Sequence, residues 1–228
     1  MFLFKRFLIL AVVAVVFTVS AAAQQTVEES YLQETIEVMI IRETARSQSR
    51  EQKLISIEYI KEAIERGNRN DEIRQTLAFL ASEGSRSVAR ENNRVVNNFP
   101  DVRRQAVRYL GQMGSEEARK SLIDVITSER EPMVLQEAIK SLGDIGTNEN
   151  NETVAHIAWV MNRTSNLNPD NLMALATIDA FEKIANKNGG LNSPDAVHTL
   201  IRISEGNYIT PVKERARQLI ADLRTYGR

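Results

Sequence analysis

Two segments of the chain carry the same residue pattern at positions that differ by thirty-two. One begins at Pro100 (PDVRRQAVRYLGQMG) and the other begins at Pro132 (PMVLQEAIKSLGDIG). Each proline is followed by an alanine six residues later, a leucine ten residues later and a glycine eleven residues later. An internal repeat of this length predicts a stack of similar units, because a single unit of about 20–45 residues cannot bury its apolar side alone.

The repeated unit is expected to be a pair of helices. Val102, Val107 and Leu110 have the spacing of one apolar helix face. Related first helices start near residues 71, 169 and 210, although the last two need a shift of one residue to align. Second helices are predicted in EEARKSLIDVITSE, NETVAHIAWVMNR and SPDAVHTLIRIS, and also in SRSVARENNRVVNNF. Two longer amphipathic helices are predicted at residues 27–46 and 50–66, and no strand is predicted.

Signals for the starts and ends of helices accompany this pattern. Asn168-Pro169, Ser193-Pro194 and Thr210-Pro211 each join a residue that caps helices to a proline, which suits the first helical position. Glycine adopts the left-handed backbone of a helix end at low cost, so the helices are expected to end at Gly111, Gly114, Gly143 and Gly146. The longest loop is expected over residues 188–194.

The segments DVRRQAVRYLGQMGSEEARKSLIDVI and LQEAIKSLGDIGTNENNETVAHIAWVM resemble HEAT repeats, in particular the short HEAT-like repeats of phycobilisome lyases. The resemblance is clear over residues 70–164 and weaker over 165–225. It implies an all-α fold, a right-handed α-solenoid (superhelix) of stacked antiparallel helix pairs. We expect this array at residues 69–228, with an N-terminal helical pair at residues 24–68 as its cap.

The first twenty-three residues are predicted to be a secretory signal peptide. Lys5 and Arg6 precede the apolar run FLILAVVAVVFTV, and Ala21-Ala22-Ala23 provides a small-residue cleavage site. The alternative is a retained membrane anchor, but the run is shorter than the roughly 20 apolar residues of a typical span. Cleavage after Ala23 would leave no membrane span in the mature chain and place the protein in the bacterial periplasm or outside the cell.

Composition limits the classes of function. Without Lys5 and Arg6, 27 basic residues stand against 30 acidic ones, which argues against a nucleic-acid binder. The chain has no cysteine, so disulfides, thiolate metal sites, cysteine nucleophiles and a lipoprotein anchor are excluded. No glycine-rich phosphate loop, nucleophile elbow or acidic calcium loop occurs in the sequence.

The HEAT-like family includes two enzyme-like branches. The diiron hydroxylases bind iron through His-Glu pairs, whereas His156 and His198 are followed by Ile157 and Thr199. The chromophore lyases act inside photosynthetic cells, which fits poorly with an export signal. The sequence therefore predicts a protein that is not an enzyme and uses no cofactor or metal.

Two groups of residues are candidates for contact with a protein partner. One is a basic surface, with a helical stripe of arginines and a second cluster on the following helix: Arg86, Arg90, Arg94, Arg103, Arg104 and Arg108. The other lies on the second helices, which are expected to line a concave face: Arg119, Lys120, His156, Arg163 and His198. The alternatives are a solvated, partly paired basic face, and, for the two histidines, a metal site. Trp159 is expected in the core rather than on a binding platform.

Three functions remain open at this point, of which a lyase-like enzyme is the least favoured. The leading hypothesis is an exported scaffold or adaptor that binds a protein partner, which the sequence does not name. The alternative is a structural protein that assembles with itself, with the helices of residues 27–66 as the interface.

Overall fold

The computed structural model describes residues 27–165 and 169–226. The predicted signal peptide lies outside these residues. The chain divides into two compact units, Met1–Met39 and Ile40–Arg228, so that residues 40–68 belong to the same unit as the residues that follow them. The boundary expected between a cap and the repeat array near residue 68 stays a prediction.

Ten α-helices, a short 3₁₀ turn and a two-stranded hairpin make up the described residues. They are α2 (Val27–Arg46), α3 (Arg50–Glu65), α4 (Asp71–Ser82), β1 (Arg90–Glu91), β2 (Arg94–Val95), α5 (Pro100–Met113), α6 (Glu116–Ser128), α7 (Pro132–Ile145), η1 (Glu149–Asn151), α8 (Glu152–Ser165), α9 (Asn171–Asn188), α10 (Pro194–Glu205) and α11 (Thr210–Leu223).

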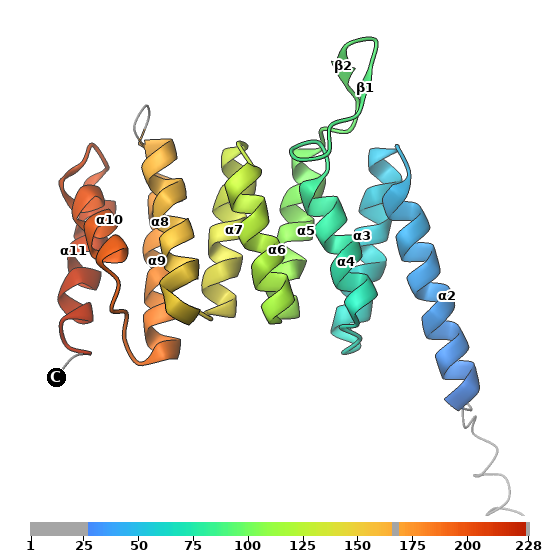
Figure 1. The fold of residues 1–228 in the computed structure, drawn as a ribbon, viewed down its shortest axis with the longest axis horizontal. Coiled ribbons are helices and arrows are strands. Elements are labelled where there is room, and N and C mark those ends of the chain that lie inside the picture. Colours follow the sequence, from blue (N-terminus) through green and yellow to red (C-terminus); the bar gives the residue numbers. More distant parts are fainter. Residues whose placement is uncertain (1–26, 166–168, 227–228) are drawn as a thin grey trace, which may run out of the picture. The chain divides into compact units, whose positions relative to one another are not determined.

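Within the unit of residues 40–228, the helices form two rows. The first helices of successive pairs (α3, α5, α7, α9 and α11) each pack on the next one in the row. The second helices (α4, α6, α8 and α10) do the same, and neighbouring members of the two rows also touch. The prediction of a first helix near residue 71 is wrong, because α4 lies in the row of second helices. This arrangement confirms the prediction of an all-α solenoid of stacked helix pairs (Figure 1).

The repeated apolar residues form the core between the rows. Ala106 and Leu110 of α5 and their counterparts Ala138 and Leu142 of α7 have no exposed surface. Burying a leucine side chain contributes roughly 1.5–3 kcal/mol. Because each helix covers the next, the same positions must be apolar in each repeat.

The four glycines have two different roles. Gly114 and Gly146 end α5 and α7 with left-handed backbones, at φ angles of 69° and 70°, as predicted. The prediction for Gly111 and Gly143 is wrong, because both lie inside their helices. A Cβ atom on Gly143 would stand 2.6 Å from the Cα atom of Ala180 in α9, and one on Gly111 would stand 2.7 Å from the Cβ atom of Ser141 in α7. These glycines let neighbouring first helices approach closely.

The predicted helix starts are confirmed in part. Ser193 caps α10 by accepting a hydrogen bond from the backbone N–H of Ala196, with Pro194 at the first helical position. By contrast, α9 begins two residues after Pro169 and is capped by Asp170. Helix α11 begins at Thr210, after an Ile209 that makes no side-chain cap.

The helix predicted over residues 85–99 is wrong, because this segment contains a hairpin. Strands β1 and β2 pair antiparallel, with Arg90 opposite Val95 and Glu91 opposite Arg94. The two central residues of the turn, Asn92 and Asn93, have φ angles of 47° and 66°. Two positive φ angles match the twist of a tight hairpin, and asparagine tolerates that conformation. The hairpin lies in the connection from Glu83 to Phe99. This connection is longer than the one at residues 188–194, so the prediction of the longest loop there is wrong.

The close approach at Gly143 can be tested by substitution. We expect Gly143→Ala to lower the free energy of unfolding by about 1–2 kcal/mol, because overpacking against α9 outweighs the gain in helix propensity. Lys140→Ala changes an exposed residue of the same helix and should have little effect. Urea denaturation measures the free energy of unfolding of both variants. A Gly143→Ala variant more stable than the unchanged protein would contradict the role of Gly143 in the close approach of α7 and α9.

Candidate protein-binding surfaces

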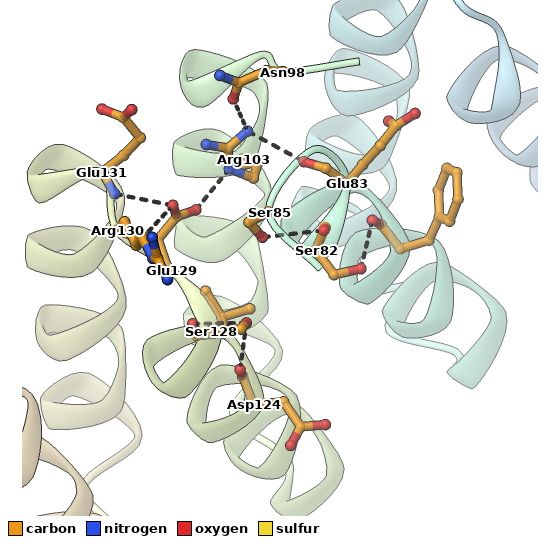
Figure 2. A network of polar contacts seen from close by, with 12 residues as sticks. Ser82, Glu83, Ser85, Asn98, Arg103, Asp124, Ser128, Glu129, Arg130 and Glu131 are labelled. Atoms are coloured by element: carbon orange, nitrogen blue, oxygen red, sulfur yellow. Dashed lines mark hydrogen bonds and ion pairs between the residues drawn. The ribbon is translucent and has the colours of Figure 1, made fainter. Parts of the chain in front are cut away.

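Arg103 lies in the interior of the protein instead of on a basic surface. Its side chain is 2% exposed, and its Nε atom donates to the Oε2 atom of Glu129 at 2.7 Å. Its Nη1 atom donates to the Asn98 side chain at 2.8 Å and to the Glu83 carbonyl at 3.2 Å (Figure 2). Arg103 therefore links α5 to the segments that follow α4 and α6, and no partner can reach it.

Glu129 supports the start of the next repeat as well as the ion pair. Its Oε1 atom accepts hydrogen bonds from the backbone N–H groups of Arg130 and Glu131, at 2.8 and 3.0 Å. These residues directly precede α7, whose N-cap residue Glu131 makes no side-chain cap of its own. One carboxylate thus neutralises Arg103 and satisfies two backbone donors at the turn into α7 (Figure 2).

A related ion pair occurs one repeat earlier. Lys53 has no exposed side-chain surface and lies 2.6 Å from a carboxylate oxygen of Glu83. Lys53 and Arg103 are each the fourth residue of their helix, and Glu83 and Glu129 each directly follow a second helix. The two pairs occupy matching places, so these two successive repeats share a buried cation that binds the residue after the following second helix. The next repeat has Leu135 at this position of α7.

Arg119 is also an interior residue. It is 1% exposed and bonds to Glu116 of its own helix at 2.6 Å and to Glu152 of α8 at 2.7 Å. A third bond reaches the hydroxyl of Thr153 at 3.0 Å. The hydrogen bond to Glu116, aided by the one to Glu152, raises the pKa of Arg119. Arg119 holds α6 against α8 and is not available to a partner.

The remaining arginines of the basic group are exposed to different degrees. Arg104 and Arg108 both donate to the buried carboxylate of Glu137, at 3.2 and 2.9 Å. Burial raises the pKa of Glu137, but the hydrogen bonds from Arg108 and Arg104 outweigh burial and hold it below its ordinary value. Arg86 forms an exposed pair with Asp124 at 3.1 Å.

Arg90 and Arg94 are exposed on the hairpin instead of on a helix. The six arginines therefore do not form one stripe, because they lie on a hairpin, its base and a separate helix.

The second helices place the other candidates in register. The fifth residue of each second helix is one of these candidates: Lys120 in α6, His156 in α8 and His198 in α10. This register explains why the two histidines occupy similar positions in the sequence. Lys120 and His198 are exposed, whereas the partly buried His156 has its Nδ1 atom 2.9 Å from the carbonyl of Glu152. No group of three or more histidine, aspartate or glutamate side chains suited to a metal ion occurs among the described residues.

Trp159 is on the surface, so its expected place in the core is wrong. It is 48% exposed. The guanidinium of Arg163 lies 4.6 Å from the centre of its ring, within cation–π range. Arg163 also donates to the carbonyls of Thr127 and Glu129, each at 2.9 Å, and so caps the end of α6 from α8. The sequence contains a signal for this contact, because Arg163 follows Trp159 by four residues and this spacing places the two side chains on one helix face.

A mixed surface extends from α8 to α10, which pack on each other. Ile201 of α10 is 37% exposed and, like Trp159 of α8, is the eighth residue of its helix. A hollow of about 340 Å³ is lined by residues of the same two helices that include Asn162, Thr199 and Ile203, but not by Trp159 or Ile201. We give the name second-helix surface to six side chains of α6, α8 and α10, all of them exposed except the partly buried His156: Lys120, His156, Trp159, Arg163, His198 and Ile201.

The comparisons with known proteins agree with the architecture. Residues 94–166 match the family model of HEAT repeats. None of the curated proteins compared with the chain matches it. In the part of the chain that the structure describes, no helix is long and apolar enough to cross a membrane.

The buried ion pair can be tested against an exposed one. We expect Arg103→Met to lower the free energy of unfolding by about 3–5 kcal/mol, because Glu129 is left buried without its cation. Arg86→Met breaks the exposed pair with Asp124 and should cost about 1 kcal/mol or less. Chemical denaturation compares the two, and equal losses would show that the buried pair has no special role.

The acid dependence of stability should reflect Glu137. Its pKa is lower in the folded state than in the unfolded state, so its contribution is complete above about pH 4.3 and disappears as the pH falls through the folded value. Glu137→Gln should be less stable at neutral pH and lose less stability on acidification. Thermal unfolding from pH 7 to pH 3 measures both, and parallel curves for the two proteins would contradict this assignment.

Proposed function

We propose that this chain is an exported, non-catalytic scaffold of the bacterial envelope that binds a protein partner on its second-helix surface. The match to HEAT repeats supports a role in protein interaction. The observation that carries the choice of surface is the half-exposed Trp159, held in place by Arg163. Tryptophan and arginine are among the residues that contribute most to protein interfaces.

The surroundings of Trp159 suit such a role. Its ring belongs to a regular helix and contacts Arg163, which three backbone carbonyls hold in place, so little conformational freedom is lost on binding. Ile201 adds apolar area on the neighbouring helix, and Lys120 and His198 supply a polar edge. An apolar centre with a polar rim is typical of protein interfaces.

Export is supported by the sequence before the described residues. The basic start, the apolar run and the three alanines at 21–23 have the order of a signal peptide. The absence of cysteine is compatible with an envelope protein that depends on its core and buried ion pairs.

The partner surface can be tested with photo-crosslinking in the source cells. A photoreactive residue at Ile201 should give one reproducible protein adduct, whereas one at Met133 of α7, which is also exposed, should not. Ile201→Glu and His198→Glu should weaken binding of the identified partner at least 10-fold without changing thermal stability, because neither side chain is buried. Adducts at Met133 alone would reject this surface.

Export can be tested by mass spectrometry of the protein that the cells accumulate. We expect a chain that begins at Gln24 in the envelope fraction. Replacing Ala21 and Ala23 by lysine should block cleavage, because the cleavage site requires small residues. Accumulation of a chain that retains Met1 in the cytoplasm would reject export.

A further inference from the structure

Two arginines lie close together at the end of α6. The Nη2 atom of Arg163 in α8 donates at 2.9 Å to the carbonyl of Glu129, which belongs to the peptide group that joins Glu129 to Arg130. Arg130 is exposed in the connection from α6 to α7 (Figure 2). Partial burial and repulsion from Arg130 lower the pKa of Arg163, so each guanidinium group lies in the electric field of the other.

No acidic side chain lies within ion-pair distance of this pair in the part of the chain that the structure describes. The nearby carboxylate of Glu129 is bonded to Arg103 and to two backbone N–H groups. Glu131 is exposed and pairs with neither arginine. Arg130 and Arg163 therefore differ from the buried Arg103, whose charge a carboxylate neutralises directly.

The ends of the neighbouring helices supply no carboxylate either. Asp124 is the last acidic residue of α6, and it pairs with Arg86 at 3.1 Å. Asp170, before α9, accepts hydrogen bonds from the first backbone N–H groups of that helix. The residues at 165–168 contain no acidic side chain in their sequence. The positive charge of the two arginines is thus available to an anion from another molecule.

Arg163 is held in place and retains a donor for a ligand. Three carbonyls at the end of α6 accept hydrogen bonds from its Nη1 and Nη2 atoms. The guanidinium group also lies 4.6 Å from the centre of the Trp159 ring. Its Nε atom donates to none of the residues that the structure describes. A guanidinium fixed in this way loses little conformational freedom when it binds a ligand.

We propose that Arg130 and Arg163 bind a carboxylate of the partner protein, next to an apolar side chain of the partner that packs on Trp159. This inference rests on the proposed function and names the chemistry of the partner, an acidic residue beside an apolar one. Charge complementarity favours a carboxylate, because charge-assisted hydrogen bonds from arginine to an acid are strong. The exposed Trp159 and Ile201 favour a protein segment over a free anion, which would leave both apolar side chains uncovered.

Peptide selection tests this chemistry before the partner is known. A phage-displayed library of random peptides is selected on the full chain, purified in the form that its source cells accumulate. Peptides that no longer bind Ile201→Glu report the second-helix surface. Among them, aspartate or glutamate beside an apolar residue should be enriched over the unselected library.

The affinity of the best selected peptide tests Arg130 itself. Trp159 is the only tryptophan of the chain, so a tryptophan-free peptide can be titrated by fluorescence. Arg130→Glu should raise the Kd about 10-fold or more, and the neutral Arg130→Gln about 3-fold. Arg69→Glu is the matched control, because it makes the same charge change at an exposed residue between α3 and α4 and should leave the Kd unchanged.

The Arg130 variants should fold normally. The residue is exposed, and the backbone N–H group that Glu129 binds is retained in both variants. Helical circular dichroism and thermal unfolding of Arg130→Gln should match those of the unchanged protein, so that a weaker affinity reports the lost charge.

The remaining outcomes overturn the inference and separate it from the proposed function. Peptides that depend on Ile201 but lack acidic residues, or bind the Arg130 variants as well as Arg69→Glu, would reject the carboxylate site alone. A selection without any peptide that depends on Ile201 would reject the second-helix surface together with this site. Vesicles of phosphatidylglycerol that bind the protein, but not Arg130→Glu, would assign the two arginines to lipid phosphate instead.

Discussion

The ion pair between Arg103 and Glu129 is the contact on which the centre of the array depends. Both side chains are 2% exposed, so the cost of removing their charges from water must be offset by complete hydrogen bonding. Arg103 also holds Asn98 and the carbonyl of Glu83, and Glu129 also holds the backbone that leads into α7. The pair joins the connection between α4 and α5 to the connection between α6 and α7, which apolar packing could not orient with the same specificity.

Close helix approach is the second constraint. The first helices of neighbouring pairs meet at Gly111 and Gly143, where the next helix provides Ser141 and Ala180. A side chain at either glycine would push the row apart. The repeated glycine, like the repeated alanine and leucine, is therefore required by the contact between units, because each unit must present a matching surface to the next.

The same reasoning separates structural charges from those available for binding. Arginine is planar and always charged, and the protein uses it where a carboxylate or several carbonyls must be bound in the interior. Arg103 and Arg119 connect two or more elements in the interior. Arg163 also connects two elements, but its side chain stays exposed, and Lys120 and His198 likewise remain at the surface. The surface available to a partner is therefore smaller and more apolar than the number of basic residues in the sequence indicated. It is centred on Trp159 and Ile201.

The sequence by itself determined the repeat, the helix pairs and the apolar positions, because helical periodicity and repeat spacing are local properties. It also placed Lys120, His156 and His198 at equivalent positions. Only the tertiary structure decided which charges are buried, because Arg103 finds Glu129 twenty-six residues away and Arg119 finds Glu152 thirty-three residues away. It likewise decided that Trp159 is exposed, and that Arg86, Arg90 and Arg94, spaced as on a helix, belong to a hairpin whose turn depends on two asparagines with positive φ. Such outcomes depend on which neighbour fills the space beside a residue, and sequence periodicity carries no information about that neighbour.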